Sequence, residues 1–191
     1  FSYRAAGNVL LTKGRAAYDK GDESLAFKDL YSANQLYRLS LNKKIVEEKS
    51  LLDEVSMIVA GKSFAAEKKY AEALDAVNKF HEFYPASPKI SEMNNLAIDT
   101  NLAWARDFQS TADYQGCLEH FQTAMKNYPE EAAARKDEID AAMADNYLKW
   151  GQALSEDKDY AQAVEKLEIV VNDYPQSKSF DEAYQAAARA H

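Results

Sequence analysis

Cys117 and His120 are the two residues of this sequence whose types and spacing come nearest to a metal site or a catalytic site. They stand three positions apart in a segment that is expected to be helical, so both side chains could face one metal ion. The chain has one cysteine and three histidines, and no other cysteine or histidine has a spacing that would complete such a site. We therefore expect Cys117 to be packed in the core, and a metal or enzymatic site at this pair remains the alternative.

Carboxylates are numerous, but they recur along long stretches that are expected to be helical. Examples are Glu47, Glu48, Asp53, Asp137, Glu138 and Asp140. Lysine and arginine side chains are interspersed with them, which is typical of solvated helix faces. The sequence also has no glycine-rich phosphate loop. We predict a chain that is not an enzyme and that holds no cofactor and no metal.

The composition favours an all-helical fold. Hydrophobic residues make up 47% of 191 residues, and only six glycines and four prolines interrupt a sequence that is rich in Ala, Leu, Glu, Lys and Gln. The net charge of −8 argues against a nucleic-acid partner, and the lack of a run of about 18 apolar residues argues against direct insertion into a membrane. Because the chain opens at Phe1, we expect it to be a fragment of a longer chain.

One pattern occurs three times along the chain. It runs from Tyr70-Ala71-Glu72-Ala73-Leu74 to Tyr84-Pro85, from Tyr114-Gln115-Gly116-Cys117-Leu118 to Tyr128-Pro129, and from Tyr160-Ala161-Gln162-Ala163-Val164 to Tyr174-Pro175. Pro85 and Pro129 are 44 positions apart, and Pro129 and Pro175 are 46 positions apart. A period of this length indicates a helical repeat array, in which each unit buries its apolar face against its neighbours.

Helix signals divide the chain into units of about 1–38, 42–85, 88–129, 130–175 and 179–191. The expected helices after the first pair are 42–67 with Asn42 as N-cap, 70–83, 88–110, 114–127, 130–155 and 160–172. The first pair turns at Lys20-Gly21-Asp22, and Ser179 with Glu182 forms a capping box that opens the last helix. Tyr37 is followed by Arg38 and not by proline, so that junction is expected to be nearly continuous helix.

Small residues recur in register through these units. The column where two helices cross reads Gly14, Gly61, Ala105 and Gly151, and the small column of each second helix reads Ala26, Ala73, Cys117 and Ala163. The two columns that follow are Leu30, Val77, Phe121 and Leu167, and Ala33, Phe80, Ala124 and Val170. Helices that pack about 8 to 10 Å apart leave no room for large side chains at the crossing.

These columns resemble the tetratricopeptide repeat (TPR), which implies an all-α, right-handed α-solenoid of four helix pairs plus the start of a fifth, in a single repeat domain. The usual unit has about 34 residues, so the resemblance is to a long-period variant, and other α-solenoids of about 40 to 47 residues remain an alternative. The Tyr-Pro-x-Ser endings at 84–87 and 174–177 resemble those of bacterial cell-envelope repeat proteins, including outer-membrane assembly lipoproteins and periplasmic division-coordinating proteins. This similarity favours the bacterial cell envelope, and a cytoplasmic location stays open.

In members of this family the first helices line a concave groove that binds partners. One residue beyond the crossing column stand Arg15, Lys62, Arg106 and Gln152, and one turn earlier stand Leu11, Ile58, Leu102 and Leu148. A basic row beside an aliphatic row suits an extended peptide with carboxylates and apolar anchors. The sequence does not reproduce the carboxylate clamp of the chaperone-binding members. The resemblance therefore implies a non-catalytic scaffold for a protein or peptide partner.

Two other interpretations remain open. The basic residues could be solvated ends above buried stems, with the aliphatic row in the core of unusually long helices. The chain could also be a structural module that self-associates through its extended helices, which would make it a homo-oligomer.

Overall fold

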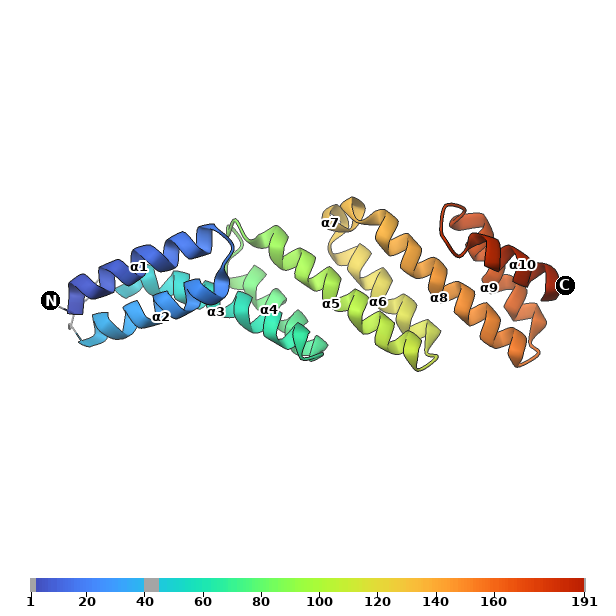
Figure 1. The fold of residues 1–191 in the computed structure, drawn as a ribbon, viewed down its shortest axis with the longest axis horizontal. Helices are drawn as coiled ribbons and strands as arrows, with labels where there is room; N and C mark the ends of the chain where they lie inside the picture. Colours follow the sequence, from blue (N-terminus) through green and yellow to red (C-terminus); the bar gives the residue numbers. More distant parts are fainter. Residues whose placement is uncertain (1–2, 40–44, 191) are drawn as a thin grey trace. The chain divides into compact units, whose positions relative to one another are not determined.

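The computed structural model describes the backbone of residues 3–39 and 45–190, which is helical with connecting turns and contains no strand in those ranges (Figure 1). The helices there are α1 (Tyr3–Asp19), α2 (Glu23–Leu39), α3 (Ile45–Ala66), α4 (Tyr70–Phe83), α5 (Ile90–Ser110), α6 (Tyr114–Asn127), α7 (Pro129–Ala134), α8 (Lys136–Glu156), α9 (Tyr160–Asp173) and α10 (Phe180–Ala190). Their order and consecutive pairing confirm the predicted all-α helical repeat fold. The hand of the superhelix stays a prediction.

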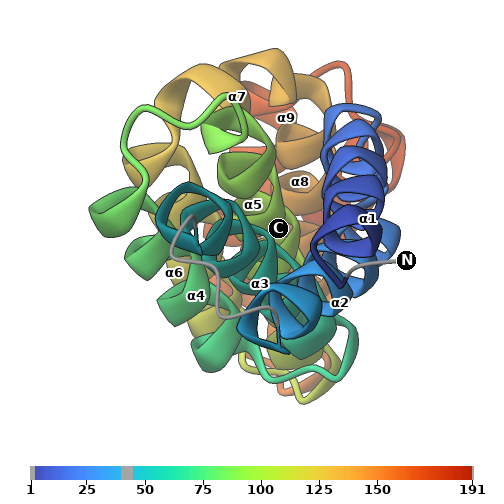
Figure 2. The ribbon, with the colours of Figure 1, turned by 90° about the vertical axis from the view of Figure 1, so that its left-hand side faces the viewer.

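The chain divides into two compact units, residues 1–96 and residues 97–191. In unit 1, α1 lies side by side with α2, and α3 packs against α4 (Figure 1, Figure 2). In unit 2, α8 packs against α9, and α10 covers both of them as the start of a fifth pair. α5 begins in unit 1 and continues in unit 2, where its aromatic side chains contact α6. That the whole chain is one repeat domain stays a prediction.

The small residues predicted at the helix crossings are all buried. A Cβ atom added at Gly14 would lie 2.7 Å from Cγ of Leu30, and one added at Gly151 would lie 2.5 Å from Cγ of Leu167. Real Cβ atoms do not approach carbon that closely, so these helix pairs require glycine. The second small column is also buried, and this confirms that Cys117 is a core residue.

The turn inside each helix pair repeats the same left-handed backbone residue. Its φ is 79° at Gly21, 58° at Lys68, 60° at Ala112 and 66° at Lys158. In the first turn the N–H of Asp22 donates to the carbonyl of Ala17 at 2.9 Å, and the equivalent bond recurs in the others. The carboxylates of Asp22, Asp113 and Asp159 then cap the second helix of their pairs, whereas the equivalent Lys69 provides no side-chain cap.

The predicted helix over 130–155 is wrong in one respect, because it is broken into α7 and α8 at Arg135. Arg135 has φ −114° and ψ 20°, outside the helical region. Its guanidinium lies 2.7 Å from a carboxylate oxygen of Asp99 and 2.8 Å from one of Glu138. The carbonyl of Arg135 accepts the N–H of Ile139 to start α8. The third pair's first helix begins at Ile90, two residues later than predicted.

Three sequence-based expectations fall on residues that are not described. Asn42 as an N-cap and the continuous helix after Arg38 both depend on residues 40–44, and the end of the last helix depends on His191.

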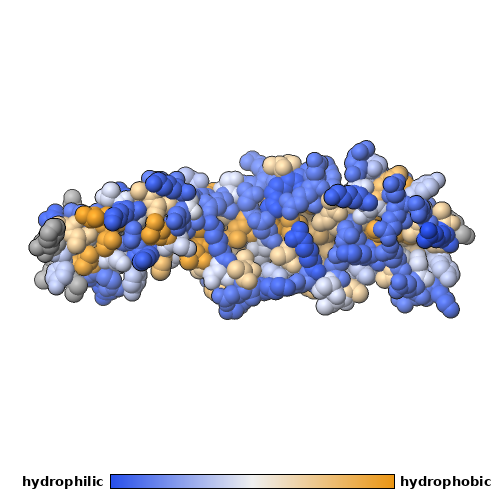
Figure 3. Space-filling model, in the orientation of Figure 1, coloured by the Kyte–Doolittle hydropathy of each residue, from blue (hydrophilic) through white to orange (hydrophobic). Residues whose placement is uncertain are grey.

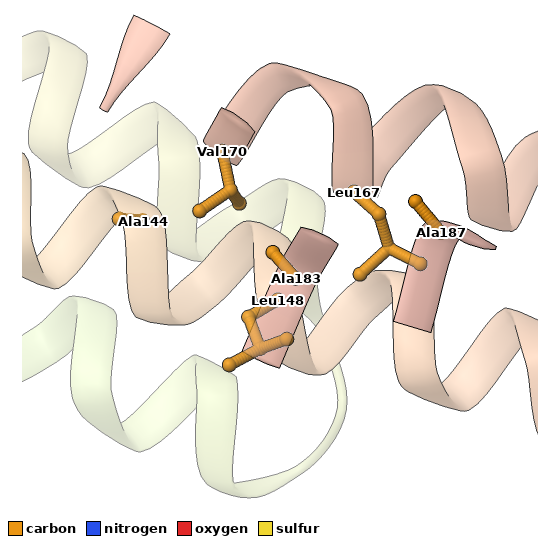
Figure 4. Close-up of a cluster of buried hydrophobic side chains, with 6 residues drawn as sticks. All are labelled: Ala144, Leu148, Leu167, Val170, Ala183 and Ala187. Atoms are coloured by element: carbon orange, nitrogen blue, oxygen red, sulfur yellow. The ribbon is translucent and has the colours of Figure 1, made fainter. Parts of the chain in front are cut away.

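A small apolar cluster anchors the C-terminal part of unit 2. It consists of Ala144 and Leu148 from α8, Leu167 and Val170 from α9, and Ala183 and Ala187 from α10, all buried (Figure 4). The ring of Tyr174 packs against this cluster. The cluster therefore fixes the turn that follows α9, at Tyr174-Pro175-Gln176-Ser177, beside the N-terminal half of α8.

Candidate functional site

The eight predicted groove residues do not share one environment. In unit 1, Leu11 is half-buried, Ile58 is buried, and Arg15 and Lys62 are exposed; in unit 2, Leu102 and Leu148 are buried, Gln152 is half-buried and Arg106 is exposed. Ile58, Leu102 and Leu148 are core residues, so they offer no surface to a partner. This agrees with the interpretation that places the aliphatic row in the core of unusually long helices. The contribution of the exposed members to binding stays a prediction.

In unit 1, Lys62 belongs to an internal ion-pair network. Its Nζ lies 2.9 Å from Oε2 of Glu23 and 2.7 Å from Oε1 of Glu92. Lys89 contacts the same two carboxylates at 3.4 and 3.0 Å, and the side chain of Glu23 is only 7% exposed. Burial alone would lower the pKa of Lys62, but the hydrogen bonds from Glu92 and Glu23 raise it overall. The charge of Lys62 is thus balanced within the chain, and we call these four residues the Glu23 network.

In unit 2, Arg106 lines a cavity of about 420 Å³ between α5, α6 and α8. Nε2 of Gln109 donates to Asp145 at 3.2 Å, and Nζ of Lys149 lies 2.7 Å from the same carboxylate. The Cys117 side chain borders this cavity, and burial followed by the charge of Asp145 raises the pKa of its thiol to about 12. The thiol therefore stays protonated near neutral pH and is a poor nucleophile or metal ligand.

A larger cavity of about 700 Å³ lies where the turn after α9 meets α8. Its lining residues are Asp137, Asp140, Ala141, Asp145, Asp173, Tyr174, Pro175, Gln176, Ser177, Lys178 and Ser179. Ala141 and Asp145 also line the Arg106 cavity, so the two cavities are neighbours along α8. We call this surface the α8 groove and define it by Arg106, Ala141, Asp145, Tyr174 and Ser177.

The α8 groove is negatively charged at its larger cavity. Burial, together with the charges of Tyr147, Asp140 and Asp173, raises the pKa of Tyr174 to about 12. Asp140 is paired with Lys136, but Asp137 and Asp173 make no ion pair in the part of the chain that the structure describes. Hydrophilic side chains gather around α7 and the start of α8 (Figure 3). Sequence reasoning took Asp137 and Asp140 for a solvated helix face and missed this cavity.

The alternative metal pair is engaged in packing. Nδ1 of His120 lies 3.1 Å from Oδ1 of Asn101, and its ring stacks on Trp104 and Phe108 at centroid distances of 4.3 and 5.3 Å. Burial lowers the pKa of His120, which favours the neutral ring. Within residues 3–39 and 45–190, no group of three His, Cys, Asp or Glu side chains is placed to hold a metal ion.

Comparison with protein-family models identifies a family for this chain. The model of the family described as "YfiO: Outer membrane lipoprotein" matches residues 5–191. No curated protein matches the chain. The family's description confirms the expected location in the bacterial cell envelope and the resemblance to cell-envelope TPR proteins, without specifying a TPR variant. None of the described helices is both long and apolar enough to cross a membrane.

Proposed function

Because this chain belongs to the YfiO family of outer membrane lipoproteins, we propose that its α8 groove binds an extended segment of a protein partner. The family is a TPR-type protein-interaction family, and its members are non-enzymatic scaffolds. That membership supports a role as a non-catalytic interaction scaffold. Where the partner binds is our proposal, and it moves the binding surface from a row along all four first helices to one face of α8.

The observation that carries the proposal is that two neighbouring cavities share the α8 residues Ala141 and Asp145. Ala141 is exposed and Ala142 half-buried on this face, and Arg106 and the Tyr174–Ser177 turn stand at its two ends. Small apolar side chains between charged ends suit an extended segment, because its backbone can approach the helix closely while its side chains enter the cavities. In unit 1, by contrast, Lys62 at the position of Gln152 is already paired with Glu23 and Glu92.

Site-specific photo-crosslinking tests the proposal. A photoreactive amino acid at Ala141, in the groove, is compared with one at Lys126, an exposed residue at the end of α6 that lines neither cavity. We expect an adduct with a different protein from position 141 and not from position 126. The same adducts from both positions, or only adducts of twice the mass of the chain, would contradict the proposal, and the latter would favour the self-associating module.

A charge reversal sharpens this test. Arg106→Glu places a negative charge at the exposed end of the groove, and we expect it to reduce the yield of the Ala141 adduct while leaving the helical circular dichroism unchanged. Lys62→Glu is unsuitable for comparison, because it would set a third carboxylate beside Glu23 and Glu92 and destabilise unit 1.

A further inference from the structure

The turn after α9 repeats the turn after α4, 90 positions earlier in the sequence. The N–H of Ser87 donates to the carbonyl of Tyr84 at 3.0 Å, and the N–H of Ser177 donates to the carbonyl of Tyr174 at the same distance. The next helix begins three residues after the serine in both cases, at Ile90 and at Phe180. The backbones are therefore equivalent, and any difference between the turns comes from the side chains that meet them.

In unit 1 a carboxylate from α3 fills this turn. Glu54 accepts a very short hydrogen bond from the hydroxyl of Ser87 and one of 2.5 Å from the hydroxyl of Tyr18. The hydroxyl oxygen of Ser87 also accepts the N–H of Lys89 at 3.0 Å, and Nζ of Lys89 lies 5.1 Å from the centre of the Tyr18 ring. The Ser87 hydroxyl and the Glu54 carboxylate therefore both have hydrogen-bond partners within the chain.

In unit 2 the equivalent of Glu54 is Ala144, whose methyl group belongs to the buried cluster (Figure 4). No carboxylate reaches the turn from that position. The hydroxyl oxygen of Ser177 is inaccessible to solvent and makes no hydrogen bond with any described residue. Ser177 lines the 700 Å³ cavity. An unsatisfied buried hydroxyl is costly, and a rotation about the Cα–Cβ bond of Ser177 would turn its oxygen toward the cavity, where a group from another molecule would complete the hydrogen bonding.

The charges around this cavity decide which group fits. Asp137 and Asp173 line it without an ion pair in the described part of the chain, against one cation, Lys178. Burial is the main cause of the raised pKa of Tyr174, and the charges of Asp140 and Asp173 raise it further. A carboxylate, as in unit 1, would be repelled here, whereas an N–H donor that carries positive charge would be attracted.

We propose that the cavity at the Tyr174–Ser177 turn receives a lysine or arginine side chain of the partner segment. This inference depends on the proposed function, because the cavity is one end of the α8 groove. Once the Ser177 side chain has rotated, the cation donates to its hydroxyl oxygen. Asp137 and Asp173 neutralise the cation, while its aliphatic stem contacts the ring of Tyr174 and Pro175.

Nuclear magnetic resonance titration of the whole chain tests the pocket. The probe is N-acetyl-arginine amide, and the control is N-acetyl-citrulline amide, which has nearly the same shape without the charge. We expect saturable shifts of the backbone amides of Gln176, Ser177 and Lys178 with the arginine probe, at least about fivefold weaker binding of citrulline, and no response at Ala86 or Ser87. Equal binding of citrulline, or the same shifts with calcium chloride alone, would overturn the proposal.

Variants provide the second readout. Asp137→Asn and Asp173→Asn should each weaken the arginine probe by about two- to fivefold, and Ser177→Ala should weaken it without unfolding the chain, whereas the matched Ser87→Ala should leave it unchanged. Unchanged probe affinity in all three groove variants would contradict the pocket.

The two proposals fail in different ways. Heterologous crosslinks from Ala141 without arginine-specific shifts would overturn the basic-side-chain pocket and leave the groove standing. Arginine-specific shifts in a chain that gives no such crosslinks would support the pocket and remove the groove.

Discussion

The turns that end the second helix pair of each unit have the same backbone conformation but different side-chain contacts. In unit 1 the turn is closed by Glu54, which takes hydrogen bonds from Tyr18 and Ser87. In unit 2 the same position of the repeat is Ala144, and the turn borders a cavity with the Ser177 hydroxyl left without a partner. A repeat array can stabilise one copy of a feature internally and leave another copy open, because each unit depends chiefly on its neighbours for its core. A local rule that is broken in only one copy points to function.

The charged residues of the two units differ in the same sense. The Glu23 network of unit 1 joins α2, α3 and the start of α5. Ninety positions later, Lys62 and Lys89 are replaced by Gln152 and Ser179, and Gln152 donates a hydrogen bond of 2.7 Å to Glu182. At this position of the repeat, unit 1 therefore balances its charges internally, whereas unit 2 has no equivalent network.

The two units should differ most in how much the free energy of unfolding falls when a glycine at a helix crossing is replaced. An added Cβ at Gly151 meets Cγ of Leu167 at 2.5 Å and the carbonyl oxygen of Ala163 at 3.2 Å, whereas one at Gly61 meets only side-chain atoms, the nearest being Cδ2 of Leu96 at 3.1 Å. We expect Gly151→Ala to reduce the free energy of unfolding by about 3 kcal/mol, and Gly61→Ala to change it by less than about 1 kcal/mol. Urea denaturation followed by circular dichroism measures both, and equal losses would remove this asymmetry.

The second-largest change in stability is expected when an ion pair of the Glu23 network is removed. Glu23→Gln removes a nearly buried carboxylate from two lysines and should cost about 2 kcal/mol. The control Glu182→Gln changes an exposed residue whose hydrogen-bond donor, Gln152, is neutral, so its effect should stay within about 0.5 kcal/mol. Thermal unfolding of both variants measures the difference. A loss at Glu182 as large as that at Glu23 would show that the two units do not balance their charges differently.

The two serines should respond with opposite signs. Ser87→Ala removes a hydrogen-bond donor from Glu54 and should lower the free energy of unfolding by about 1 kcal/mol. Ser177→Ala removes an unsatisfied hydroxyl, so it should leave stability unchanged or raise it by up to about 1 kcal/mol. Differential scanning calorimetry compares the two midpoints. A destabilised Ser177→Ala variant would mean that this hydroxyl has a partner within the chain.

The smallest effect is expected at the turns inside the pairs. Asp159 caps α9 through the N–H of Gln162, but the equivalent Lys69 provides no side-chain cap to α4. Lys69→Asp should therefore stabilise unit 1 by about 0.5 kcal/mol, and Asp159→Ala should destabilise unit 2 by about 1 kcal/mol. Urea midpoints check both, with no gain from Lys69→Asp as the contrary result.

Much of the fold was predictable because steric rules act locally. The glycines at 14, 61 and 151 predict close helix crossings, and the recurrence of Tyr-Pro at 84–85 and 174–175 indicates a repeat. The break at Arg135 was not predictable, because Arg135 follows an alanine-rich stretch with high helix propensity, and no glycine or proline marks the break.

The candidate site was predicted less well. Ile58 and Leu148 were placed in a groove because they follow the helical period, but the long first helices bury that face. The sequence does contain a sign of this difference between the turns. Glu54 precedes Ser87 by the same number of residues as Ala144 precedes Ser177, so the carboxylate of unit 1 is absent from unit 2 at this position. Its meaning appears only when the two turns are seen to share one backbone and one of them borders a cavity.

The most direct measurement compares the two equivalent turns as contact points for a partner. A photoreactive amino acid at Gln176 and one at Ala86 occupy the same exposed position of the turn in unit 2 and unit 1. We predict that position 176 yields an adduct with a different protein, and that position 86 yields none. Mass spectrometry should locate the crosslink within a partner segment that contains lysine or arginine. Adducts from position 86 alone, or the same adducts from both positions, would contradict the view that only the turn of unit 2 is open to a partner.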